Sequence, residues 1–295
     1  MNRPSQSLHR LIAAALLFAG ACAPALADET ASYALDVEAK LHSDIRNRGI
    51  SDTLLKPGAR LSVQLAHESG VIGLFELASS SKKQFAGGHG YSLLLAGGYR
   101  FGDPDGWHFG VGAASELFPG AGFDAPHGID LATFEPTDWR HTKYDSQFAV
   151  LEAGYGALEA RALNVLSRTY RGADTGGVCA ALGQFSADPT AALECFARGE
   201  HNSRGSWLFD LNYKRTLAPN TTLNLHAGYQ HVRHFKEATL SDYAVGISHR
   251  RWGVDFTAEW IATHARAREL YIAQDGDRLR ATDNNKVVLT VARKF

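Results

Sequence analysis

The sequence has 295 residues, of which 45% are hydrophobic, and its 30 Lys and Arg nearly balance its 31 Asp and Glu. This balance argues against a nucleic-acid partner, because replacing the counterions of a phosphate backbone needs clustered basic residues. The later chain is rich in Gly, Tyr, Phe and Trp and has no run of about 18 apolar residues. These features indicate either a secreted soluble β-protein or a membrane β-barrel.

The first 27 residues are expected to form a secretory signal peptide. Arg3 and Arg10 form the positively charged flank before an apolar core, Leu11–Gly20, and Ala25-Leu26-Ala27 offers a small-residue cleavage site. Cys22 could alternatively accept a lipid, but no Leu stands three positions before it. Removing the leader takes two of the 30 basic residues and none of the 31 acidic ones, so the net charge of residues 28–295 becomes −3.

The segment from Tyr33 to Arg46 gives the clearest strand pattern. Tyr33, Leu35 and Val37 lie on one face, whereas the other face carries ionisable residues. That face is too charged for a dry core, but it suits the polar interior of a barrel.

The same period of two recurs along the chain. It predicts eleven more strands, which lie near Ala59–His67, around Phe75, Tyr91–Phe101, Trp107–Leu117, Gln147–Tyr155, Leu158–Tyr170, Trp207–Lys214, Leu223–Gln230, Asp242–His249, Val254–Trp260 and Val287–Phe295. Short turns near Ser69, Pro104, Tyr155, Pro219 and Arg251 alternate with longer connections. We therefore predict an all-β fold, an antiparallel up-and-down transmembrane barrel of about twelve strands, because such barrels have short turns at one end and long loops at the other. A soluble sandwich is the alternative.

The longest predicted loop covers residues 171–204 and carries Cys179 and Cys195. In an oxidising compartment these two cysteines are expected to form a disulfide. Within the same loop, Asp188 and Pro189 can begin a short helix that ends near Ala197.

The last strand alternates Val287, Leu289 and Val291 with a largely polar face and ends in Phe295. A terminal aromatic residue in phase with the apolar row resembles the insertion signal of bacterial outer-membrane barrels. We therefore expect contact with outer-membrane lipids, and delivery by the barrel-assembly machinery, in a Gram-negative cell.

A more specific resemblance involves the first connection. Residues Ser43–Thr53, which contain Arg48, Gly49, Ile50 and Ser51, resemble the opening of the Gcw_chp family of uncharacterised proteobacterial outer-membrane proteins. Lys56–Ala59, His67–Gly70 and Glu152–Gly156 are also similar to segments of that family. The long cysteine-bearing loop departs from the family pattern. The resemblance implies a secreted barrel and brings no established activity.

Three common catalytic motifs are absent from the sequence. The sequence has no His-Glu-x-x-His, Cys-x-x-Cys or Gly-x-Ser-x-Gly motif, so we assign no catalytic, cofactor or metal residues. An outer-membrane hydrolase remains the alternative. Its candidate residues lie in two loops and are His127, Asp130, His141 and Asp145 in one and His231, His234, Ser241 and Asp242 in the other.

The residues predicted to line the lumen carry both signs of charge. They are Asp36, Glu38, Lys40, His42, Arg46, Arg60, Glu76, Arg100, Glu116, Arg161, Asp210, Lys214, Asp255 and Glu259. If these residues pair across neighbouring strands, they can fill a closed structural or adhesive barrel. If they are segregated onto opposite walls, they leave a narrow polar channel. We favour a porin-like channel for passive diffusion of small polar solutes.

Overall fold

The structure is a computed structural model that describes residues 32–295 except 104, 131 and 189. The predicted signal peptide, including Cys22, lies outside the described residues. No helix among the described residues is both long and apolar enough to cross a bilayer.

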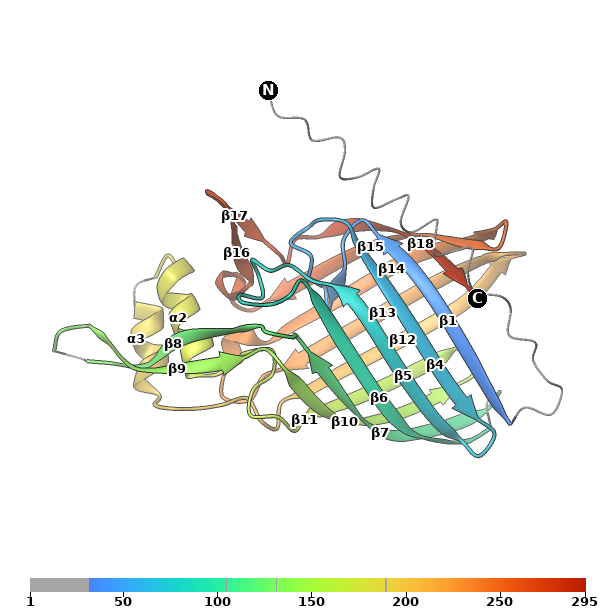
Figure 1. The fold of residues 1–295 in the computed structure, drawn as a ribbon, viewed down its shortest axis with the longest axis horizontal. Helices are drawn as coiled ribbons and strands as arrows, with labels where there is room; N and C mark the ends of the chain where they lie inside the picture. The colour runs from blue at the N-terminus through green and yellow to red at the C-terminus, as the bar shows by residue number, and fades with distance from the viewer. Residues whose placement is uncertain (1–31, 104, 131, 189) are drawn as a thin grey trace, which may run out of the picture.

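Twelve strands form a closed antiparallel barrel, as the sequence predicts (Figure 1). In chain order they are β1 (Tyr33–His42), β4 (Gly58–His67), β5 (Val71–Ser79), β6 (Tyr91–Gly102), β7 (Trp107–Leu117), β10 (Ser146–Tyr155), β11 (Leu158–Val165), β12 (Trp207–Ala218), β13 (Thr221–His231), β14 (Leu240–Arg251), β15 (Val254–Ala265) and β18 (Lys286–Lys294). Pairing of β1 with β18 closes the cylinder, with Leu41 opposite Val291. Closure leaves the described part of the barrel sheet without an unpaired edge strand, and the sandwich alternative is therefore wrong.

The outer surface of the barrel is apolar because side chains alternate between its two faces. Leu35, Val111, Leu151, Val245 and Leu289 all point outward, and each is about half exposed. A broad apolar band of this kind fits the hydrocarbon of a bilayer.

Val288 breaks the alternation of the last strand for a structural reason. It is buried on the inner wall against Ala244 of β14 and Ile261 of β15. The barrel interior is therefore partly apolar.

The two ends of the barrel differ. Both ends of the described chain, β1 at its start and β18 at its close, lie at the end with the tight turns. The opposite end carries folded loops, which occupy the left of Figure 1. Their elements are β2 (Arg46–Asn47), β3 (Ile50–Ser51), β8 (Gly122–Ile129), β9 (Pro136–Lys143), α2 (Thr175–Phe185), α3 (Thr190–Ala197), η1 (Lys236–Ala238), η2 (Arg268–Tyr271), β16 (Ile272–Asp275) and β17 (Arg278–Ala281).

Two strands are shorter than the sequence indicates. The first ends at His42 and not near Arg46, and the seventh ends at Val165 and not near Tyr170. In both cases the residues beyond the strand fold into loops over the mouth of the barrel. The long connection between β7 and β10 contains a further hairpin, β8–β9.

Helices α2 and α3 form a small core with the inner wall of the barrel. Cys179 and Cys195 join the two helices through the predicted disulfide. Val178 and Leu182 of α2 are buried in one cluster with Phe148 of β10. Helix α3, Thr190–Ala197, confirms the predicted short helix, although Pro189, its predicted first residue, lies outside the described residues, and α2 was not predicted.

Candidate functional site

The segment Ser43–Pro57, here called the inner hairpin, folds from the loop end into the barrel. Its two short strands, β2 and β3, are joined by Arg48 and Gly49. Both residues have positive φ, 48° for Arg48 and 71° for Gly49. Such a pair suits a tight two-residue hairpin turn, whose twist matches that of the flanking strands. The Arg-Gly pair of the family-like motif therefore forms the tip of the hairpin.

A buried carboxylate fixes the base of the inner hairpin. Asp44 accepts hydrogen bonds from Ser51 Oγ at 2.5 Å and Thr53 Oγ1 at 3.0 Å, and Arg46 Nε lies 2.9 Å from its other oxygen. Its side chain has no exposed surface. A buried charge needs such partners to offset its desolvation, so this network holds the hairpin in one conformation.

The tip of the hairpin reaches the opposite wall. Arg48 Nη2 lies 2.8 Å from Asp210 Oδ2 on β12. In the barrel order β12 is five strands from β1 in one direction and six strands from β4 in the other, so this ion pair spans the lumen. A Cβ atom added to Gly49 would lie 2.1 Å from Thr263 Oγ1, which leaves no room for a larger residue there.

A second set of ion pairs holds the hairpin to a loop. Arg171 donates to both carboxylate oxygens of Asp52, at 2.8 and 2.9 Å, and also to both carboxylate oxygens of Glu116. Burial opposes the charge of Arg171, but the two carboxylates outweigh it and raise the pKa of this guanidinium above its ordinary value. Arg171 therefore stays charged, and most of its donors are already used.

A cavity of about 600 Å³, here called the lumen cavity, lies inside the barrel between the inner hairpin and the end with the tight turns. Residues of nine barrel strands line it, from Asp36 on β1 round to His226 on β13. Five of the predicted lumen residues lie on it, and these are Asp36, Arg100, Glu116, Arg161 and Asp210. The walls also include Leu74, Val150 and Leu208, so the cavity is lined by both polar and apolar groups.

The charged inner wall is largely paired. Arg60 pairs with Glu76 at 3.3 Å, and Glu152 lies between Arg100 and Arg161, at 2.5 and 3.0 Å. The remaining predicted residues lie close to polar groups or glycine. Lys40 pairs with Glu38, Arg46 with Asp44, Asp255 with Arg250 and His42 with Thr290, while Lys214 lies opposite Asn224 and Glu259 lies over Gly246. Pairing across strands and an open cavity therefore coexist.

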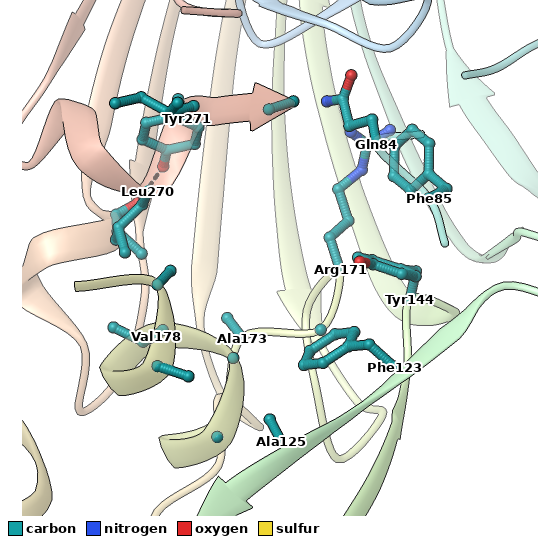
Figure 2. A pocket seen from close by; sticks show the side chains of 18 of the residues that line it. Gln84, Phe85, Phe123, Ala125, Tyr144, Arg171, Ala173, Val178, Leu270 and Tyr271 are labelled. Carbon is teal, nitrogen blue, oxygen red and sulfur yellow. Dashed lines mark hydrogen bonds between the residues drawn. The ribbon is translucent and has the colours of Figure 1, made fainter. Parts of the chain in front are cut away.

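A second cavity of about 610 Å³, here called the vestibule, lies on the loop side of the inner hairpin. It shares Asn47 and Tyr170 with the lumen cavity, so the hairpin tip lies between the two. In Figure 2, Tyr271, Leu270 and Val178 form one side, and Gln84, Phe85, Arg171, Tyr144 and Phe123 form the other. The inner hairpin thus lies between a chamber formed mostly by the loops and a chamber inside the barrel.

The loop residues considered for hydrolysis do not converge on one centre. His127 is buried against Glu200 and His141 lies against Asp124, whereas Asp145 accepts a hydrogen bond from the Phe118 amide. Ser241 and Asp242 are consecutive on β14 and so face opposite sides of the wall. Asp242 pairs with His226 inside the barrel at 3.0 Å. His234 stacks on His201, and His231 ends β13. Asp130 caps its own loop through the amides of residues 132 and 133.

Several residues of the interior were not singled out from the sequence. Arg171 and Asp52 fall in predicted connections and Glu152 falls in a predicted strand, and none of the three is among the residues predicted to line the lumen. The one available signal was the density of charged and turn residues between His42 and Gly58. A connection of that composition does not reveal that it turns into the barrel.

Searches against protein-family models and curated proteins find no match to this sequence. Among solved structures, the NanC porin is similar over 88% of this chain and 98% of its own, at 8% identity and a TM-score of 0.47. The KdgM porin in complex with disordered oligogalacturonate is similar over 88% and 97%, at 8% identity and 0.45. An outer membrane channel from Pseudomonas putida F1 is similar over 91% and 99%, at 12% identity and 0.41. These similarities are in the barrel fold.

Proposed function

We propose that this chain is a channel of the Gram-negative outer membrane through which small polar solutes diffuse passively. The observation that carries the proposal is the pair of cavities, about 610 Å³ at the loop end and about 600 Å³ inside the closed barrel, that both border Asn47 and Tyr170. Side chains just fill the interior of an eight-stranded barrel, and a barrel of twelve strands is wider. Water can occupy chambers of this size beside so many charged groups.

The inner hairpin would set the size limit of the channel. Its tip is held by the Arg48–Asp210 ion pair on one side and the Asn47–Glu116 hydrogen bond at 3.3 Å on another. Because its base is held by the Asp44 network, the hairpin would act as a fixed constriction and not as a mobile gate.

The membrane context supports the same proposal. The half-exposed apolar residues of the outer wall would meet lipid acyl chains, and the final strand ending in Phe295 would be recognised by the barrel-assembly machinery. Residues 1–27 would be removed as a signal peptide and residues 28–295 would form the mature barrel. N-terminal sequencing of protein isolated from outer membranes tests that boundary.

Kinship with the Gcw_chp family is part of the proposal. It is supported by the Arg48–Ser51 motif, which forms the tip and second strand of the inner hairpin. In this view the motif serves the constriction, and other barrels with the same motif would have a similar hairpin.

Liposome swelling tests the proposed transport. Folded protein in liposomes should admit small neutral sugars and exclude sugar oligomers, because the hairpin narrows the path. A matched preparation that has been unfolded before reconstitution gives the background. Equal swelling rates for the folded and unfolded preparations would contradict the proposal.

A further inference from the structure

We infer that the vestibule is a binding site for an uncharged, hydroxylated ring, such as a neutral sugar unit, that has one apolar face. This inference deepens the proposed function, because the bound solute would be the one presented to the inner hairpin.

Aromatic rings form much of the vestibule wall. Phe123 and Tyr144 have ring centroids 5.2 Å apart, and Phe85 stands edge-on to Tyr144 at the same separation. Trp139 also lines the vestibule and is 63% exposed, so its indole ring is accessible to a solute. Aromatic faces offer large apolar contact with little loss of side-chain freedom, and a ring with one apolar face can stack on them.

The charged residues of the vestibule wall already have partners. Lys83 pairs with Asp275 at 2.6 Å and Arg171 with Asp52 and Glu116, and Asp124 is hydrogen-bonded to His141 Nδ1 at 3.0 Å. An ionic solute would have to displace one of these pairs and would gain little net attraction. The binding of an uncharged solute does not depend on attraction to these charges, so their pairing does not weaken it.

The tyrosines of the wall are also neutral. Burial raises the pKa of Tyr144 and of Tyr170 to about 12. Burial likewise raises the pKa of Tyr271. The phenols therefore remain protonated at any physiological pH and add no charge to the vestibule.

One polar group of the wall lacks a partner. Gln84 Oε1 is buried and accepts no hydrogen bond from the residues that the structure describes. The atom itself is closed to solvent, so a solute hydroxyl reaches it only once the Gln84 amide rotates toward the vestibule, and the resulting hydrogen bond would relieve the cost of the unpaired acceptor. Asn47, Gln184, Gln230 and Gln274 also line the vestibule, and the amide nitrogens of Asn47, Gln230 and Gln274 already donate to Glu116, Ala238 and Gly276.

The wall opposite these rings is apolar, and the volume of the vestibule suits such a solute. Val178 and Leu270 lie across the cavity from Phe123 (Figure 2). The volume of about 610 Å³ falls in the usual range for small-molecule sites. A sugar-sized ring would thus have one face on aromatic carbon and hydroxyl groups near amides.

Saturation-transfer NMR on folded, detergent-solubilised protein tests the inference. Three probes share one ring, and these are methyl β-D-glucoside, glucuronate and glucosamine. We expect transfer to the neutral glucoside to exceed transfer to the anion and the cation. Gln84→Leu should weaken glucoside binding about fivefold, the effect of one lost hydrogen bond. Trp139→Ala should weaken it as well, and because Trp139 is exposed this variant should still fold.

Gln147→Leu is the matched control, since Gln147 is exposed and does not line the vestibule. It should bind the glucoside like the unaltered protein. Stronger transfer to a charged probe, no transfer to any probe, or unchanged binding in both vestibule variants would overturn the inference. Because binding is measured without a membrane, a bound glucoside with no swelling in liposomes would instead contradict only the proposed transport.

Discussion

Arg171 and Asp52 lie 119 residues apart in the chain and form a two-pronged ion pair inside the barrel mouth, at 2.8 and 2.9 Å. Arg171 also lies over the Phe118 ring, with 5.2 Å to the ring centroid. One guanidinium thus joins the inner hairpin, the last strand before the β8–β9 loop and the helical loop. Loss of this group would release three segments at once.

Arg171→Ala should destabilise the protein by about 3–5 kcal/mol, because Asp52 and Glu116 would remain as buried charges without a partner. Urea unfolding followed by tryptophan fluorescence measures the change. Arg204→Ala, which removes an exposed arginine from the same loop, should leave the unfolding midpoint unchanged. Equal midpoints for both variants would show that the ion pair contributes little.

Arg48→Ala should increase single-channel conductance and shift selectivity toward cations. The change removes the side chain that spans the lumen and leaves Asp210 as an uncompensated negative charge. Loss of this charge-assisted bond should also cost about 1–3 kcal/mol of stability. Arg251→Ala, at a short turn outside the lumen, is the control and should leave the conductance and the ion selectivity unchanged. Unchanged conductance and reversal potential in Arg48→Ala would argue against a constriction at this point.

Acid should loosen the β16–β17 hairpin. Hydrogen bonds from Lys83 and Lys56 lower the pKa of Asp275 from 3.8 to about 2. Because the folded-state pKa is depressed, this contact stabilises the fold fully above pH 3.8 and is lost as the pH falls toward 2. Pepsin should therefore cleave the hairpin faster at the lower end of that range.

Asp275→Asn should reproduce the loosening at neutral pH, seen as faster tryptic cleavage at Arg278 and Arg280. Asp277→Asn, which changes an exposed neighbour, should resist trypsin like the unaltered protein. If the two variants were cleaved at the same rate, the lysine contacts would not be holding the hairpin.

Removing the disulfide should loosen the helical loop and spare the barrel. Replacing Cys179 and Cys195 by Ser frees a loop whose closure is worth about 3 kcal/mol in the chain-entropy model. Hydrogen exchange should rise in α2 and α3, whereas the barrel strands stay protected because their pairing does not involve the helices. Uniform loss of protection would instead show that the helices support the whole barrel.

The barrel could be predicted from the sequence because a strand with lipid on one side and water on the other must alternate. Leu35, Leu95, Val245 and Leu289 all point outward as their alternation indicates. The alternating short and long connections then indicated an even-stranded cylinder. The alternation is visible within each strand separately, and the barrel contains twelve such strands.

The interior could not be predicted in the same way. Whether Ser43–Pro57 turns inward depends on contacts with Asp210 and Glu116, which lie far away in the chain. Helix α2 was hidden because its first turn contains Gly176 and Gly177, which disfavour helices. Both glycines are required by packing, since a Cβ at Gly176 would lie 2.6 Å from His127 Nε2 and one at Gly177 would lie 2.3 Å from the Gly172 carbonyl oxygen.

The central claim is that a water-filled path runs through the barrel and passes the tip of the inner hairpin. Asn47→Cys places a thiol where the two cavities meet, and the disulfide occupies the other two cysteines of the described chain. Planar-bilayer recordings of this variant should show discrete current steps that fall when a water-soluble methanethiosulfonate reagent is added, while the unaltered protein keeps its current. The absence of any current from correctly folded protein, or current steps in the variant that the reagent leaves unchanged, would contradict the claim.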